Sequence, residues 1–153
     1  MDVLVVEDGP LVREAVARDL RAAGYRVGEA ATAEAALATA EAAAAAASGP
    51  PPVVVTGLHL GPGRDGLSLG AEALRRWPEV GVVYVTCRPG ALDGRLLGPR
   101  EHYVVKPCAP EALRQAVRRL MPAWAPGRAP PWAAGLGQAV AVALGLAGAQ
   151  KGA

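Results

Sequence analysis

The chain has 153 residues and a mass of 15.5 kDa, which suits one domain and leaves little room for a second. A hydrophobic content of 52% excludes an acidic disordered chain, and a net charge of +2 gives no general nucleic-acid footprint. Phe is absent and aromatic residues make up 4%, so we expect a core of Val, Leu and Ala.

Charge and composition both change near residue 122. All 14 acidic residues precede this point, whereas two basic residues, Arg128 and Lys151, follow it, so the excess charge belongs to the C-terminal part. Pro and Gly also crowd together there. We therefore predict a domain over residues 1–122 and a Pro/Ala/Gly-rich tail over residues 123–153, which could include a short apolar helix.

No targeting or membrane segment is expected. The N-terminal sequence MDVLVVED lacks the basic region of a signal peptide, and the apolar stretch 136–149 is shorter than the roughly 20 residues that span a bilayer. Two cysteines cannot form a disulfide framework. We expect a cytoplasmic protein that does not bind membranes.

Short apolar runs alternate with helical patterns along the chain. We predict strands over residues 2–6, 25–30, 53–56, 80–86 and 102–105, and helices over residues 10–23, 33–47, 67–76, 91–97 and 110–120. Gly24 and Thr32 suit a helix C-terminus and a helix N-cap. In the last helix, the side chains expected to face the core are Leu113, Ala116, Val117 and Leu120. This alternation predicts an α/β fold with a doubly wound parallel sheet of order 2-1-3-4-5.

Polar side chains follow four of the predicted strands. The strand ends read Glu7-Asp8, Thr56-Gly57, Thr86-Cys87 and Lys106-Pro107. Since ligands bind beyond the carboxyl ends of parallel strands, these groups should share one crevice. Two carboxylates, a hydroxyl and an ammonium group suit a divalent cation beside a phosphoryl anion.

Four segments carry a family resemblance over residues 1–121: VLVVEDGPLVRE, VVVTGLHLGPGRDGL, VVYVTCRP and HYVVKP. The chain resembles the response-regulator receiver domains of bacterial two-component signalling, which implies a flavodoxin-like fold. The resemblance assigns Mg²⁺ binding to Glu7, Asp8 and the backbone carbonyl of His59, phosphoryl contact to Thr86, the salt bridge to Lys106, the proline after it to Pro107, and the switch aromatic to Tyr103.

One position departs from the family pattern. The family's phosphoacceptor Asp aligns with Gly57, which has no side chain to attack a phosphohistidine or to form an acyl phosphate. Because a metal ligand is lost as well, Mg²⁺ binding is expected to be weak or lost. Asp65 fits a turn before a helix and His59 fits a solvated loop, so neither replaces the acceptor.

Three side chains leave alternatives open. Cys87 and Cys108 could form a metal or redox pair, although small buried residues are the preferred interpretation. Tyr103 is either fixed in one rotamer over the neighbouring helix or an edge-strand aromatic with a wet hydroxyl.

These observations predict a stand-alone, non-enzymatic pseudo-receiver that is not phosphorylated at the usual site. It would act on a histidine kinase, a phosphotransferase or another signalling protein, or dimerise through segments 91–97, 102–105 and 110–120. There, Arg114, Arg118 and Arg119 would face outward and could bridge an interface. No helix-turn-helix or basic stripe indicates nucleic-acid binding.

Two alternatives remain. The first is an enzyme-like module that binds phosphate or a metal through the strand-end cluster of Glu7, Asp8, Thr86 and Lys106. The second is that the natural protein has Asp at position 57 and that this residue was deliberately replaced by Gly.

Overall fold

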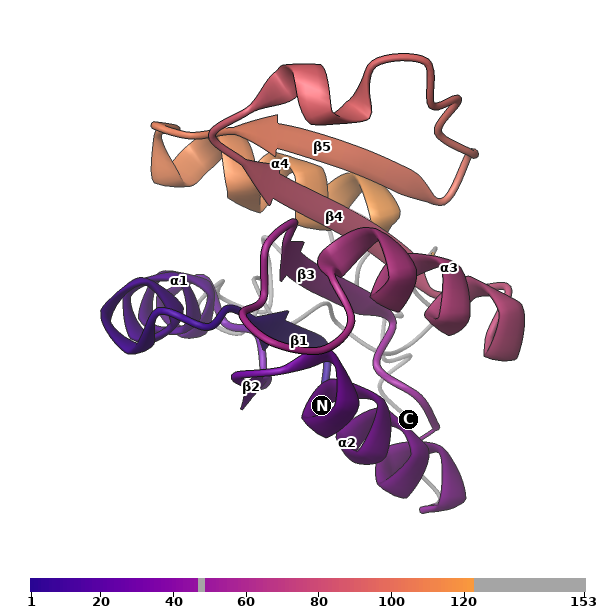
Figure 1. The fold of residues 1–153 in the computed structure, drawn as a ribbon. Helices are drawn as coiled ribbons and strands as arrows, with labels where there is room; N and C mark the ends of the chain where they lie inside the picture. Colours follow the sequence, from indigo (N-terminus) through magenta and orange to yellow (C-terminus); the bar gives the residue numbers. More distant parts are fainter. Residues whose placement is uncertain (47–48, 123–153) are drawn as a thin grey trace, which may run out of the picture.

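A computed structural model of the chain describes residues 1–46 and 49–122 (Figure 1). The strands are β1 (Val3–Val6), β2 (Val27–Ala30), β3 (Val53–Gly57), β4 (Gly81–Thr86) and β5 (Glu101–Val105). The helices are α1 (Pro10–Ala22), α2 (Ala33–Ala45), α3 (Gly66–Arg76) and α4 (Pro110–Leu120), with a 3₁₀ helix η1 (Pro89–Leu92). The predicted tail, residues 123–153, lies outside the described residues.

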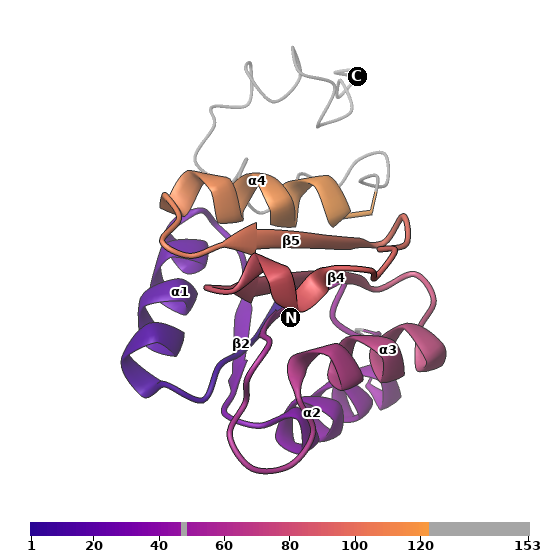
Figure 2. The same ribbon diagram turned by 45° about the horizontal axis from the view of Figure 1, so that its top comes forward.

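The five strands form one parallel sheet in the order β2-β1-β3-β4-β5, which confirms the predicted topology. Helices α1 and α4 cover one face, and α2 and α3 cover the other (Figures 1 and 2). The central strands β1, β3 and β4 are buried throughout because both of their faces are covered. This is why their sequences are nearly continuous aliphatic runs.

Two hydrophobic clusters fill the spaces between the sheet and its helices. Along β1, Val3 and Val5 belong to the cluster under α1 and α4, whereas Leu4 and Val6 belong to the cluster under α2 and α3. Four α4 side chains complete the first cluster, as predicted: Leu113, Ala116, Val117 and Leu120. Among the described residues of this Phe-free chain, the largest fully buried side chain is Tyr84.

Helix ends follow the capping residues of the sequence. The Thr32 hydroxyl accepts a hydrogen bond from the Ala35 N–H at 3.1 Å, as expected of an N-cap. Gly24 follows α1 with a φ of +94°, a conformation that favours glycine. Asp65 caps α3 by accepting from the Ser68 N–H at 2.7 Å, and this bond lowers the pKa of its carboxyl group. Asp65 therefore has a structural role before a helix.

The predicted helix over residues 91–97 is wrong. Only η1 (Pro89–Leu92) forms, and the chain then turns through Gly94, whose φ is +77°. The segment is held instead by the Arg95 guanidinium, which donates to Glu101 at 3.0 Å, while the Tyr84 hydroxyl donates to the same carboxylate at 2.7 Å. Burial and this carboxylate raise the pKa of Tyr84.

Other predicted boundaries differ by one or two residues. Tyr25, predicted to begin the second strand, instead precedes β2 and is buried under α1 and α4. No helix among the described residues is long and apolar enough to cross a membrane.

The packing of α3 on β4 yields a stability prediction. A Cβ at Gly70 would overlap the Tyr84 hydroxyl and lie 2.8 Å from Tyr84 Cζ. Gly to Ala inside a helix usually stabilises by about 0.5–1 kcal/mol, but overpacking a buried site costs about 1–3 kcal/mol. We expect Gly70→Ala to lower the free energy of unfolding, measured in urea, by about 1–2 kcal/mol.

The matched control is Gly90→Ala within η1, whose Cβ would meet its nearest neighbour, Asp93 Oδ2, at an ordinary 3.4 Å. We expect this variant to change the same free energy by less than about 0.5 kcal/mol. A Gly70→Ala protein that is more stable than the parent would show that α3 does not pack on Tyr84 as described.

Candidate functional site

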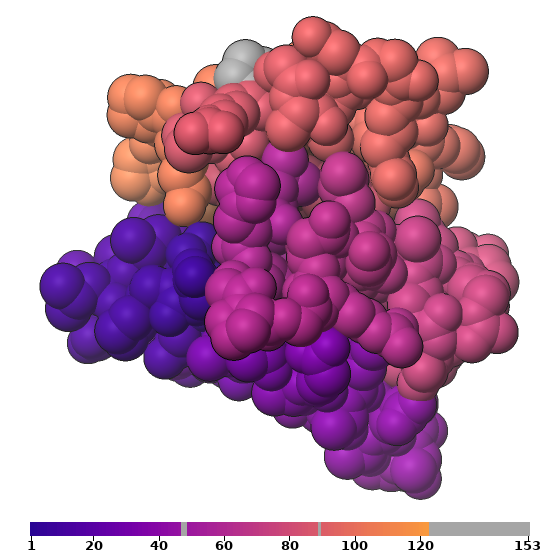
Figure 3. Space-filling view, in the orientation of Figure 1, coloured from indigo at the N-terminus to yellow at the C-terminus, as the bar shows by residue number. Residues whose placement is uncertain are grey.

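Six of the eight predicted strand-end residues meet in one crevice of about 210 Å³, whereas Thr56 and Pro107 are not part of its lining. Its lining comprises Glu7, Asp8, Gly57, Leu58, His59, Val85, Thr86, Cys87 and Lys106. The parallel register explains this convergence, because Val6 pairs with Thr56 and Thr86 pairs with Val105 across the sheet. The β3–α3 loop (magenta) projects on this face between the indigo N-terminal segment and the red-to-orange segments near the C-terminus (Figure 3).

An ion pair crosses the crevice. Lys106 Nζ lies 3.3 Å from Glu7 Oε2, and the side chains of Lys106 and Glu7 are 34% and 14% exposed. The other carboxylate oxygen, Oε1, accepts from the Gly9 N–H at 3.3 Å, and Arg13 donates to the Glu7 carbonyl oxygen at 2.8 Å. Glu7 is therefore held between the start of α1 and the end of β5.

Gly57 ends β3 directly beneath this ion pair. A Cβ at position 57 would lie 3.0 Å from Glu7 Oε2, 3.6 Å from the His59 carbonyl oxygen and 3.7 Å from a Leu60 methyl group. A contact of 3.0 Å is tighter than ordinary van der Waals packing, so a side chain there would require Glu7 to move by a few tenths of an ångström. The Glu7 carboxylate thus lies against the place where an acceptor side chain would begin.

Thr86 is buried at the end of β4, and its hydroxyl is already bonded. It accepts from the Arg88 N–H at 2.9 Å and donates to the Arg88 carbonyl oxygen at 3.1 Å. The hydroxyl lines the crevice while it fixes the turn that follows β4. Lys106 is likewise paired with Glu7, so a bound phosphate would have to displace existing bonds of both groups, and this geometry does not favour the alternative of a phosphate-binding enzyme.

Tyr103 lies on the edge strand β5 rather than in the crevice lining. It is 46% exposed, and its ring centroid is 6.3 Å from that of His102. Of the two alternatives for Tyr103, this conformation fits the exposed aromatic residue on an edge strand. The Lys106–Pro107 peptide bond is cis.

The metal ligands expected from the sequence form an incomplete set. Glu7 is paired with Lys106, and within residues 1–46 and 49–122 no group of three or more His, Cys, Asp or Glu side chains is arranged to hold a metal ion. Mg²⁺ is usually held through one or two carboxylates, with waters completing its octahedron, and here Glu7 is paired with a cation while position 57 offers no oxygen. This leaves the Asp8 carboxylate and the His59 carbonyl oxygen as the available ligands among those expected, so the residues present fit Mg²⁺ poorly.

The two cysteines differ in their surroundings. Cys108 is half-buried against the cluster under α1 and α4, whereas Cys87 is exposed at the crevice. The expectation of a small buried residue is therefore wrong for Cys87, because β4 ends one residue earlier at Thr86.

Sequence reasoning did not anticipate that Glu7 would reach Lys106. The sequence did contain an indication of this pair. Glu7 follows β1 and has a long side chain, and Gly57 at the end of the neighbouring strand β3 leaves space for it to cross. The hydrogen bonds of Thr86 to Arg88 involve the backbone, and no residue pattern indicates them.

The response regulator receiver domain family model matches residues 3–118. The chain is 38% identical over 125 residues to the transcriptional regulatory protein AruR of Pseudomonas aeruginosa, covering 78% of this chain and 48% of AruR. It is 30% identical over 120 residues to the positive alginate biosynthesis regulatory protein of the same organism. This match covers 78% of this chain and 46% of that protein. The chain thus spans about half the length of these curated relatives.

Solved receiver structures share the fold. The response regulator TrrA of Thermotoga maritima, in complex with Mg²⁺-BeF, has a TM-score of 0.67 at 26% identity, covering 79% of this chain and 100% of that one. The receiver domain of NtrX from Brucella abortus has a TM-score of 0.62 at 26% identity, covering 78% and 98%.

The ion pair across the crevice is open to a double-mutant cycle. We expect Glu7→Gln and Lys106→Met to be coupled by about 0.5–1 kcal/mol in the free energy of unfolding, because the pair is only partly shielded from water. Urea denaturation of the parent, both single variants and the double variant gives this energy. The more exposed pair Arg21–Glu29, whose side chains are 48% and 29% exposed, serves as a weaker reference. Additivity of Glu7→Gln with Lys106→Met would contradict the pairing.

Proposed function

This chain belongs to the response regulator receiver domain family, and from that premise we propose that it is a pseudo-receiver, not phosphorylated at the usual strand-end position. The observation that carries the proposal is Gly57. Phosphoryl transfer to a receiver needs a carboxylate nucleophile at this point, and glycine supplies none. A Cβ at position 57 would lie 3.0 Å from Glu7 Oε2, so the Glu7 carboxylate borders the space that an acceptor side chain would need. This arrangement supports the proposal.

Glu7 does not take over as acceptor in this proposal. Its carboxylate bonds Lys106 and the Gly9 N–H, so a phosphoryl group on it would displace the crevice's own ion pair. The pair instead gives Lys106 a permanent anionic partner. The protein therefore holds one conformation of the crevice and signals through contacts rather than through a phosphorylation cycle.

The proposed partner is a protein of the signalling pathway, such as a histidine kinase or a phosphotransferase. A homodimer through η1, β5 and α4 remains part of the proposal, and exposed Leu96, Tyr103 and Val105 on and before β5 support it. Arg114 was expected to bridge such an interface, but it is half-buried and bonds Asp19 and Glu111 of its own chain. The proposal concerns the receiver domain alone, because the chain spans about half of its curated relatives.

Restoring the acceptor tests this function. We expect Gly57→Asp to gain one phosphoryl group on incubation with acetyl phosphate and Mg²⁺, because Glu7 ends in a flexible carboxylate that can shift away from the new Cβ. The parent chain should gain none. Intact-mass spectrometry measures the change directly.

The matched control is Gly57→Asn, which has the shape of the aspartate variant but no nucleophilic carboxylate. It should remain unmodified under the same conditions. A stable phosphoryl group on a crevice residue of the parent chain would overturn the proposal. Failure of Gly57→Asp alone would show that the loss extends beyond position 57.

A further inference from the structure

A second, larger cavity lies at the opposite end of the sheet from the crevice. It has a volume of about 380 Å³ and is lined by Pro50, Pro51, Pro52, Arg76, Trp77, Pro78, Glu79, Val80 and Pro122. These residues come from the connection before β3, the end of α3 with its turn into β4, and the residue after the α4 C-cap. We refer to this cavity as the proline groove.

The lining of the proline groove is apolar and stiff. Five prolines and the Trp77 ring supply most of its residues, and prolines lose little conformational freedom on binding. Aromatic-lined grooves are a common docking place for proline-rich segments. The surface therefore suits a short chain rich in Pro and Trp.

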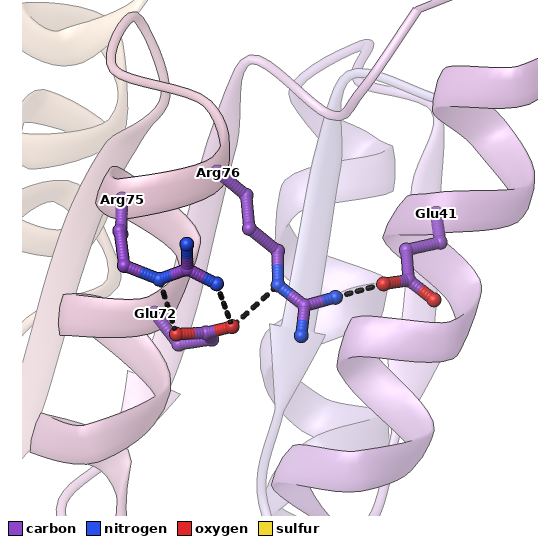
Figure 4. A network of polar contacts seen from close by, with 4 residues as sticks. All are labelled: Glu41, Glu72, Arg75 and Arg76. Atoms are coloured by element: carbon purple, nitrogen blue, oxygen red, sulfur yellow. Dashed lines mark hydrogen bonds and ion pairs between the residues drawn. The ribbon is translucent and has the colours of Figure 1, made fainter.

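Among the described residues that line the groove, the one cation, Arg76, is already engaged. Arg76 on α3 pairs with Glu72 of the same helix at 2.6 Å and with Glu41 of α2, while Arg75 also bonds Glu72 (Figure 4). This network ties α2 to α3 and occupies the guanidinium group. Glu79, by contrast, is exposed at the rim and leaves the groove with an acidic edge.

We propose that residues 123–132 of the same chain dock in the proline groove. Their sequence, AWAPGRAPPW, contains two tryptophans, three prolines and a single charge, Arg128. Apolar side chains match the lining, and Arg128 complements Glu79 at the rim.

The chain path favours this occupant over a separate molecule. Pro122 belongs to the groove lining, so Trp124 starts two residues away, within about 7 Å of extended backbone. A tethered segment binds at an effective concentration in the millimolar range, so weak contacts suffice. The docked segment would cover the amino ends of β3 and β4 and leave the Glu7–Lys106 crevice untouched.

The test uses the full chain labelled with 5-fluorotryptophan, whose three residues give separate ¹⁹F resonances assigned by substitution. We expect the Trp124 resonance to differ from that of the free peptide AWAPGRAPPW and to stay constant on dilution. Pro78→Lys, which places a charge in the groove, should move it to the free-peptide position. Trp124→Ala should in turn move the Trp77 resonance.

The matched control is Pro99→Lys, which changes a likewise exposed loop proline outside the groove and should leave the Trp124 resonance in place. A parent Trp124 resonance at the free-peptide position would overturn the proposal. A resonance that moves on dilution would also overturn it, because the occupant would then be a second copy of the chain. Neither result bears on phosphorylation at position 57.

Discussion

The ion pair between Glu7 and Lys106 is the interaction on which the crevice depends. It joins the ends of β1 and β5, which are separated in the sheet by β3 and β4, and it spans the gap left by Gly57. Glu7, Asp8 and Lys106 together carry one formal negative charge, one fewer than the same site would carry with a carboxylate at position 57. In the proposed function, Gly57 therefore bears on electrostatics, metal binding and nucleophilic chemistry at the same time.

The sheet supplies the frame that makes this pair possible. Three aliphatic strands buried under helices fix the strand ends within one parallel register, so short polar segments reach a common point. The network of Tyr84, Arg95 and Glu101 then holds the connection between β4 and β5 without a regular helix. The receiver fold can thus persist when the site changes. The fold depends on burial of apolar side chains, whereas the proposed change in site chemistry depends on position 57.

The sequence predicted the sheet well because continuous Val and Leu runs have one physical explanation, burial on both faces. It failed over residues 91–97, where glycines at 90 and 94 and the left-handed turn at Gly94 outweighed a weak apolar pattern. The strand-end rule brought Glu7, Asp8, Thr86 and Lys106 together correctly. Which of them bond one another depends on side-chain reach and on backbone acceptors, and a residue pattern does not contain that information.

The most direct measurement of the central account is an amide NMR titration of the unmodified chain with beryllofluoride and Mg²⁺. Beryllofluoride mimics a phosphoryl group, and the TrrA structure is a complex with Mg²⁺-BeF. With Gly57 in place and Lys106 held by Glu7, we expect the amides of Thr86, Tyr103 and Lys106 to remain unshifted. Saturable shifts at these three positions beyond those caused by Mg²⁺ alone would contradict the account, because the crevice would then accept a phosphoryl-like anion without an aspartate at position 57.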